Sequence, residues 1–346
     1  MNGGYFFRFY FVFLWAKNVN DMDKLAEIRL PIETELREYR TIFEHTLQTN
    51  NLLLQKALNH LLQRQGKMMR PILVLLAARY AGNVNESVLH AAVSLELLHT
   101  ASLVHDDVID RSDRRRGQKS VNALLDNRVA VLVGDFLLSK ALHHAASTGS
   151  NRVVTWVSEL GQTLSDGELM QLANIDKQEI SESDYYEVIH KKTAVLFEAC
   201  AKIGTLLGKG GEEDIDRLSR FGNTVGMCFQ MRDDLLDYDN QHDIGKPSGN
   251  DMKEGKLTLP VIYALLTSGD EAMLSLALRV RSGDATDEDI ACLVRFAHEL
   301  GGISYTEKNI DKMANDCLSL IPKDSSDPTI VESLHRYVHF VVGRDL

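Results

Sequence analysis

Apolar residues recur at intervals of three and four along most of the chain from Pro31 onward. Leu54, Leu58, Leu61 and Leu62 show this spacing, which is typical of an α-helix. Alternating runs of β-branched residues, which would predict strands, are scarce, and the polar breaks between periodic segments are short. The pattern therefore predicts an all-α fold of about a dozen helices joined by short turns.

The breaks are too short to be interdomain linkers, so residues 22–346 are expected to form a single helical domain. Residues 1–21 have a different composition. Tyr5 to Ala16 is dense in aromatic residues, is interrupted by Arg8, and is shorter than the ~20 apolar residues that a membrane-spanning helix needs. We interpret residues 1–21 as a non-native or misassigned leader, with the working protein beginning near Met22; a loose membrane-surface anchor is the alternative.

Composition and charge narrow the functional classes. The chain is 44% hydrophobic and 25% charged, as in a soluble globular protein. Its formal net charge of −11 argues against a nucleic-acid partner, because a phosphate backbone is normally bound by an electropositive face. The four cysteines are widely spaced without a CxxC pair, which favours a reducing cytoplasm over a zinc knuckle or a disulfide framework.

The first candidate site is an acidic box at the end of the apolar segment that runs from Leu97 to Asp110. On a helix, Asp106 and Asp110 lie about 40° apart, and Asp107 is offset by one residue. Two carboxylates that converge in this way repel each other, so a bound Mg²⁺ ion that is also ligated by phosphate would compensate them. The alternative is a solvated helix end that caps the next turn.

The run Arg114-Arg115-Arg116-Gly117 follows this box directly. Arginine side chains match phosphate oxygens in bidentate fashion, so cations beside a metal-binding box indicate a polyanionic substrate that bridges both. A solvated basic loop is the alternative.

A second acidic box begins 127 residues after the first and repeats its spacing with Asp233, Asp234 and Asp237. Two such boxes facing each other across a helical bundle would hold several Mg²⁺ ions around one diphosphate in a central cavity. His99 lies two helical turns before Asp106 and shares its face, unless it is a satisfied core histidine.

Further cations occur at the breaks near Lys67 and Arg70, at Lys191-Lys192-Thr193, and in the segment from Lys246 to Lys256. Each cation alone is weak, because a lysine in a loop is usually solvated. Taken in order with the two boxes, however, these motifs resemble those of the trans-isoprenyl diphosphate synthase family, over about Gly66 to Pro260. One departure is that Gln65 and Met68 stand where family members often have glycine and arginine.

The resemblance implies a helical isoprenoid synthase fold, a homodimer, and two to three Mg²⁺ ions bound with diphosphate. It implies isopentenyl diphosphate and an allylic diphosphate as substrates, and transient membrane contact for product release. The implied metal ligands are Asp106, Asp110 and Asp233, supported by Asp107, Asp234 and Asp237. The implied contacts to the allylic diphosphate are Arg115, Lys192, Lys246 and Lys256. The implied metal-free site for isopentenyl diphosphate comprises Lys67, Arg70, His99 and Arg116. Thr193 and Gln230 correspond to dipoles near the allylic carbocation.

Product length in the family depends on the residues that precede the first box, where bulky aromatic side chains stop chain growth. Here Ala101 and Ser102 are small, and Leu98 lies one turn earlier. We therefore expect an all-trans product of C30 or longer. A farnesyl or geranylgeranyl diphosphate synthase is the alternative within the family.

Alternatives from other classes remain. His99 and the His105-Asp106 doublet suggest a helical metal-dependent phosphohydrolase, although such an enzyme has no use for the second box. A non-catalytic synthase subunit would be expected to have lost one box. A cyclising terpene synthase would not need Lys67, Arg70 and Arg116 for a second diphosphate.

Overall fold

The computed structural model describes residues 24–63, 66–115, 117–238, 249–321 and 327–343. Within these residues helices predominate, and the strands form one short hairpin, which confirms the predicted all-α class. The expected leader, residues 1–21, lies outside the described residues.

The bounds of the elements place both acidic boxes at the carboxyl ends of long helices. Along the chain the elements are η1 (Leu30–Ile32), α2 (Glu33–Thr46), α3 (Leu52–Leu62), α4 (Met69–Ala81), α5 (Glu86–Ile109), β1 (Arg114–Arg115), β2 (Gln118–Lys119), α6 (Val121–Leu124), α7 (Asn127–Ser147), α8 (Asn151–Ala173), η2 (Asn174–Asp176), α9 (Glu182–Ile189), the π-helical η3 (His190–Ala194), α10 (Val195–Leu207), α11 (Glu212–Leu236), α12 (Asn250–Lys253), α13 (Leu259–Ser268), α14 (Glu271–Arg281), α15 (Asp287–Glu299), α16 (Gly302–Ser319) and α17 (Pro328–Val342).

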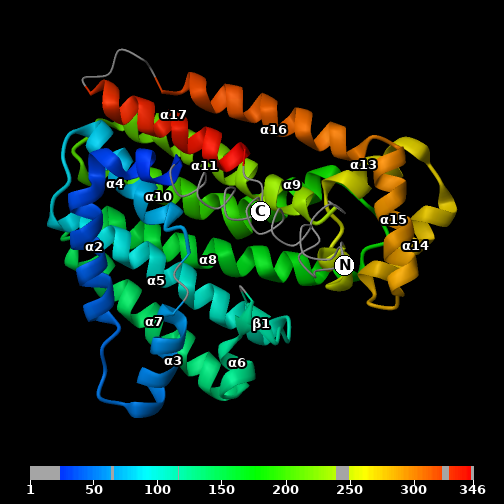
Figure 1. Ribbon diagram of the computed structural model, residues 1–346, viewed down its shortest axis with the longest axis horizontal. Helices are drawn as coiled ribbons and strands as arrows, with labels where there is room; N and C mark the ends of the chain where they lie inside the picture. Colours follow the sequence, from blue (N-terminus) through cyan, green and yellow to red (C-terminus); the bar gives the residue numbers. More distant parts are fainter. Residues whose placement is uncertain (1–23, 64–65, 116, 239–248, 322–326, 344–346) are drawn as a thin grey trace, which may run out of the picture.

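Helix α5 lies inside the bundle and packs against α4, α7, α8 and α10. Helices α16 and α17 run along one side of the molecule, at the top of Figure 1, and α7 lies toward the other side. Asn85 caps the first turn of α5 by accepting a hydrogen bond from the Val88 amide at 3.1 Å. Its apolar residues face several directions and most are buried, as expected for a helix packed on all sides. Polar side chains at its end are therefore held by a rigid core element.

Two apolar clusters support the bundle. The larger one includes buried residues of α2, α4, α5, α7 and α10, and the smaller one lies among α9, α13, α14 and α15. Helix α11 contributes to both, through Phe221 and Val225 to the larger cluster and through Met231 and Leu235 to the smaller one. The second acidic box, which follows Met231, is thus anchored beside the smaller cluster.

A glycine permits a close approach that shapes the site. Gly167 of α8 lies against η3, and a Cβ atom there would stand 2.8 Å from the Cβ of Lys191. This distance is too short for any other residue, so Gly167 lets α8 and η3 pack backbone to backbone. Glu168, the next residue of α8, reaches Lys192 as a result.

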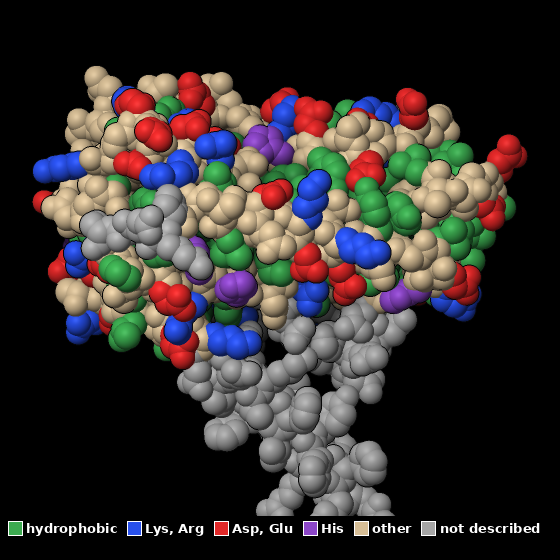
Figure 2. Space-filling model, turned by 90° about the horizontal axis from the view of Figure 1, so that it is seen from above, with side chains coloured by type: hydrophobic (Ala, Val, Ile, Leu, Met, Phe, Trp, Pro, Cys, Tyr) green, Lys and Arg blue, Asp and Glu red, His purple; other side chains and the backbone are tan. Residues whose placement is uncertain are grey.

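The surface carries charges of both signs. Figure 2, which views the molecule from the side of α16 and α17, shows acidic and basic side chains interspersed over that face. Among the described residues, α5 and α7 are the two helices long and apolar enough to cross a membrane by length and composition. Helix α5 is largely buried, whereas α7 exposes the apolar side chains of Val131, Leu132, Leu138 and Leu142.

Candidate active site

Both acidic boxes stand at the carboxyl end of a long helix. Asp106 and Asp107 belong to the last turn of α5 and Asp110 caps it, while Asp233 and Asp234 end α11 and Asp237 caps it. The dipole of a helix makes its carboxyl end negative, so carboxylates placed there are disfavoured by the helix as well as by one another. Such an arrangement needs cations.

One connection between the boxes runs through the segment that follows residue 248. The ammonium of Lys256 lies 3.5 Å from Oδ2 of Asp110, and its backbone amide donates to the carbonyl of Asp251 at 2.8 Å. The Asp251 amide in turn donates to Oδ2 of Asp237 at 2.9 Å. A short chain of contacts therefore joins the end of α5 to the end of α11, as predicted for boxes that face each other.

A second connection runs through η3. Lys192 forms an ion pair with Glu168, and its ammonium donates to Oε1 of Gln171 at 2.9 Å. Its neighbour Thr193 donates to Oε1 of Gln230 at 2.7 Å, and Nε2 of Gln230 donates to Oδ1 of Asp234 at 2.7 Å. A single π-helical turn, a form often found at functional sites, thus carries a lysine toward the first box and a hydroxyl toward the second.

In the first box, cations face the carboxylates. Oδ1 of the buried Asp107 accepts from Nε of Arg115, on the β1–β2 hairpin, at 2.6 Å. Burial and the nearby charge of Glu168 raise the pKa of Asp106 to about 6, against opposing effects of Lys192 and Arg115. Lys192 and Arg115 are two of the four residues that the family resemblance implies as contacts to an allylic diphosphate.

In the second box, neutral donors predominate. Oδ2 of Asp234 accepts from the buried Tyr185 hydroxyl at 2.7 Å, and burial raises the pKa of Asp234 to about 7. Asp237 accepts from the amide of Asn250 at 3.0 Å and from its side chain at 3.2 Å. The charge of the exposed Asp233 is one of those that oppose the lowering of the pKa of the half-buried Arg70 by desolvation.

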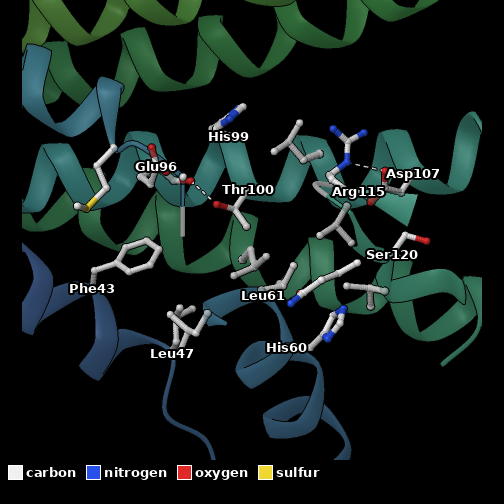
Figure 3. Close-up of a pocket in the computed structure, with 18 of the residues that line it drawn as sticks. Phe43, Leu47, His60, Leu61, Glu96, His99, Thr100, Asp107, Arg115 and Ser120 are labelled. Atoms are coloured by element: carbon white, nitrogen blue, oxygen red, sulfur yellow. Dashed lines mark hydrogen bonds and ion pairs between the residues drawn. The ribbon is translucent and has the colours of Figure 1, made fainter. Parts of the chain in front are cut away.

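Of the residues implied to bind isopentenyl diphosphate, His99 lines a cavity beside α5. Arg115, implied as a contact to the allylic diphosphate, lines the same cavity together with Glu96, Thr100 and Asp107 (Figure 3). Arg70 is half-buried and is not part of this lining; its guanidinium lies 4.9 Å from the Phe197 ring centre, and burial lowers the pKa of Arg70 against the opposing charge of Glu96. The ammonium of Lys67 lies 5.0 Å from the ring centre of Phe340, on α17. Arg116 and Lys246 lie outside the described residues.

The predicted chain-length residues occupy another part of α5. Leu98 and Ala101 are buried, and the half-buried Ser102 donates to the carbonyl of His99 at 2.9 Å. The cavity of Figure 3 is lined by residues other than these three. Their role in setting product length stays a prediction.

His105 does not join the candidate metal site. Its Nε2 lies 3.2 Å from the carbonyl of Val131, and its ring packs against Gly134 of α7. The pKa of the adjacent Asp106 is shifted by the charges of Glu168 on α8 and Lys192 on η3. The doublet that suggested a phosphohydrolase is therefore split between two faces of α5.

The boxes fit a divalent cation held jointly with its substrate. Within the described part of the chain, no group of three His, Cys, Asp or Glu side chains converges closely enough to hold a metal ion alone. All the candidate donors are carboxylate oxygens, which suit Mg²⁺, an ion that is commonly bound by one or two carboxylates plus substrate phosphates. Asp106, Asp110 and Asp233 would supply these oxygens.

Several residues that complete the site were missed by sequence reasoning. Glu168 and Gln171 hold Lys192, Tyr185 holds Asp234, and Asn250 with Asp251 holds Asp237. Only Glu168 could have been suspected from the sequence, because it is a charged residue that directly follows a glycine within a predicted helix. The others carry no local pattern.

The chain is similar to known proteins in both sequence and fold. The family model described as polyprenyl synthetase matches residues 51–296. Octaprenyl diphosphate synthase of Escherichia coli is 34% identical over 81% of this chain and 86% of its own length. The crystal structure of geranylgeranyl pyrophosphate synthase from Bacteroides thetaiotaomicron is 42% identical, with a TM-score of 0.82 over 93% of this chain and 100% of that one.

A third similar protein is the polyprenyl synthase of Caulobacter crescentus, whose crystal structure is complexed with calcium and isoprenyl diphosphate. It is 27% identical, with a TM-score of 0.85 over 92% of this chain and 98% of that one. These folds confirm the isoprenoid synthase architecture that the motifs predict. The family is known to depend on divalent metals and to use isopentenyl and allylic diphosphates. The chain belongs to the polyprenyl synthetase family and is a prenyltransferase.

Proposed function

We propose that this protein is a Mg²⁺-dependent trans-polyprenyl diphosphate synthase that adds isopentenyl units to an allylic diphosphate and releases a product of C30 or longer. The observation that carries the proposal is the chain of contacts through Lys256 that joins the two aspartate boxes. The η3 turn adds to it, since the charge of Lys192 acts on Asp106 and Thr193 reaches Asp234 through Gln230. Such an enclosure of carboxylates and cations suits a metal-bound diphosphate.

Different residues around the boxes are proposed to bind the two diphosphate substrates. Three cations form ion pairs with carboxylates of the first box or beside it: Lys192, Lys256 and Arg115. In the proposed complex they pair instead with the phosphate oxygens of an allylic diphosphate. His99, which lines the cavity of Figure 3, and Arg70 of α4 suit the second diphosphate. Two to three Mg²⁺ ions, when bound, neutralise the charge that develops on the departing diphosphate.

The chemistry needs no side-chain nucleophile. The allylic C–O bond breaks, the double bond of isopentenyl diphosphate forms the new C–C bond, and a proton leaves with the released diphosphate. The oxygen atoms of Thr193 and Gln230, which are fixed by their mutual hydrogen bond, present dipoles to the developing carbocation. Apolar walls exclude water that would quench it.

Product length is proposed from the first-box helix. Ala101 and Ser102 are small at the positions of α5 where a bulky side chain would end the path. The relatives include both octaprenyl and geranylgeranyl synthases, so family membership does not fix the carbon count. We propose the longer class on the size of these two side chains.

The proposed working unit is a homodimer in the cytoplasm. Helix α7 exposes Leu132, with 67% of its surface accessible, together with Val131, Leu138 and Leu142. Exposed apolar side chains along one long helix favour an interface, because large apolar patches are rare on monomers. A second copy that covers α7 would bury them.

The deciding experiment is incubation with radiolabelled isopentenyl diphosphate, Mg²⁺ and each allylic starter from C5 to C20, followed by chromatographic sizing. Label is expected in products of C30 or longer, and chelation with EDTA should abolish it. A dominant C15 product would reject the long-chain assignment, and undiminished turnover after chelation would reject the metal-dependent mechanism.

A matched pair of variants tests the proposed growth path. Ser102→Phe should shorten the product, because the half-buried position accepts a ring that then blocks the path. Ser102→Ala, which keeps the position small, should leave product length unchanged. Equal product lengths from both variants would show that the tail takes another route.

A further inference from the structure

Helix α11 presents one stripe of residues to the π-helical turn η3. Four residues of this stripe face η3 or the first turn of α10: Ser219, Asn223, Gly226 and Gln230. They are spaced by four, three and four residues, so they lie within about 60° of one another around the helix axis. Helix α11 also carries the second aspartate box, so the contacts of this stripe relate η3 to that box.

Asn223 joins the two sides of the turn. Its Nδ2 lies 2.8 Å from Nδ1 of His190, the first residue of η3, and donates to Oε2 of Glu198, in the first turn of α10, at 3.2 Å. Oε1 of Glu198 accepts from the Ser219 hydroxyl at 3.0 Å. A carboxylate only accepts hydrogen bonds, so Nδ2 is the donor and Nδ1 of His190 is an acceptor. The residues at both sides of η3 are therefore tied to one amide of α11.

The backbones approach closely between these hydrogen bonds. A Cβ atom at Gly226 would stand 2.5 Å from Cα of Ala194, the last residue of η3. Four residues further along α11, Gln230 accepts from the Thr193 hydroxyl at 2.7 Å. The stripe thus contacts the first, the fourth and the last residue of η3.

The register of η3 matters because the adjacent residues Lys192 and Thr193 contact different groups. Lys192 pairs with Glu168, whose charge acts on the first box, and Thr193 donates to Gln230, which donates to the second. A π-helical turn holds about one residue more than an α-helical turn. If the extra residue moved by one position, a side chain of η3 would turn by about 100° around the axis and lose its contact. Contacts from neighbouring helices therefore have to fix where the extra residue lies.

We propose that Asn223 is a positioning residue for the reaction: through His190 and Glu198 it fixes the register of η3, and so sets where Lys192 and Thr193 lie relative to the two aspartate boxes. Asn223 precedes Asp233 by ten residues, about 15 Å along α11, so it acts through η3 and not on the substrate. The inference rests on the proposed function, since it assigns Lys192 and Thr193 to the allylic substrate.

Asn223→Leu removes both hydrogen bonds and keeps a side chain of similar size. We expect kcat to fall about ten- to a hundredfold, because misplacing reacting groups by ~1 Å can cost ~10²-fold. The KM of the allylic diphosphate should rise, whereas that of isopentenyl diphosphate should not change. Thr224→Ala is the matched control, because the Thr224 hydroxyl donates to the Arg220 carbonyl within α11. A kcat equal to that of the control, or a lower kcat with both KM values unchanged, would overturn the proposal.

A reciprocal exchange of hydrogen-bonding groups tests the same residue without changing its size. Asn223→Asp puts a second carboxylate beside Glu198 and should lower kcat as Asn223→Leu does. Adding Glu198→Gln supplies an amide that donates to the new carboxylate, and the other tautomer of His190 donates to it from Nδ1. The double variant should regain most of the lost kcat, and Glu198→Gln alone should retain most of it. A double variant as impaired as Asn223→Asp would refute the positioning role.

Amide hydrogen exchange of η3 reports on its register without any turnover. Peptides that span residues 186–198 should exchange faster in Asn223→Leu and Asn223→Asp than in the wild type, and the double variant should restore protection. If the Asn223 variants do not fold, His190→Phe, which keeps a ring and removes the acceptor, should show the same faster exchange and lower kcat. Unchanged exchange in the folded variants would contradict the inference. Absence of labelled product from the wild type would instead count against the proposed function and leave the exchange result readable.

Discussion

Asp107 and Asp234 hold the same position in the two aspartate boxes and both are buried, yet different groups stabilise them. Asp107 pairs with a charged partner, Nε of Arg115 at 2.6 Å. Asp234 accepts from two neutral donors, Tyr185 and Gln230, each at 2.7 Å. The two boxes have the same five-residue spacing, but the buried aspartate has a charged partner on α5, an ionic setting, and neutral hydrogen-bond donors on α11, a dipolar setting.

This difference indicates different roles for the boxes. The cations around the first box pair with carboxylates, and the same lysine and arginine side chains can pair with phosphate oxygens when a diphosphate arrives. The donors around the second box are fixed by α9, α11 and the turn at Asn250, so this box is preorganised. We infer that the first box changes partners during turnover and that the second keeps its geometry.

The largest effect is expected from Asp106→Asn. It removes a charged ligand from the box that is proposed to receive the substrate, so kcat should fall by roughly 10²–10³-fold, the range for loss of one group that stabilises transition-state charge. The measurement is steady-state incorporation of labelled isopentenyl diphosphate. Asp216→Asn is the control, because Asp216 lies on the exposed surface of α11, away from the box. A change of less than tenfold for Asp106→Asn would contradict the role of the first box.

Tyr185→Phe tests the preorganisation of the second box. It removes a buried donor to Asp234 while keeping the ring, so kcat should fall by about tenfold, the equivalent of one hydrogen bond to a charged group. The KM of the allylic substrate should change less than kcat. Tyr186→Phe is the matched control, since its hydroxyl bonds Glu182 rather than a box residue. Equal kcat values for the two variants would show that Tyr185 is merely structural.

The positions of the two aspartate boxes can be predicted from the sequence, but the residues that hydrogen-bond to them cannot. The positions Asp106, Asp110, Asp233 and Asp237 follow from helical geometry, because residues four apart share a face wherever the helix lies. Tyr185 reaches Asp234 across 49 residues, through the packing of α9 against α11. Its position depends on helix register and on close contacts such as that of Gly167 with η3, which no local pattern encodes. From sequence alone, the stretch from Arg111 to Lys119 is predicted only as a break between helices. In the structure it contains the β1–β2 hairpin, which points Arg115 toward Asp107.

A pH-dependent stability difference is expected between Asp234→Asn and Asp107→Asn in metal-free protein. The folded-state pKa of Asp234 is raised to about 7 from an ordinary value of 3.8, so the unfolded chain loses its proton first and stability declines as pH rises through this range. Asparagine removes this penalty. Asp234→Asn should therefore raise Tm by a few °C at pH 8 and by much less at pH 4.

Asp107→Asn should show a smaller gain. Burial also raises the pKa of Asp107, but the substitution forfeits the ion pair with Arg115. Thermal unfolding in EDTA at both pH values gives the comparison. If the two variants shift Tm equally at pH 8, the ionic and dipolar settings are energetically equivalent and the contrast between the boxes fails.

The smallest effect is expected from Arg115→Lys, which keeps the charge and loses the Nε hydrogen bond to Asp107. About a third of the Arg115 side chain is exposed (36%), so the loss should raise the KM of the allylic diphosphate by only roughly two- to fivefold. Because salt screens exposed charges, the difference from wild type should shrink at high potassium chloride. Tyr185→Phe, which involves no cation, should keep its defect at both salt concentrations. A salt-independent defect in Arg115→Lys would place the first box in the same dipolar class as the second, since only an ionic contact is weakened by added salt.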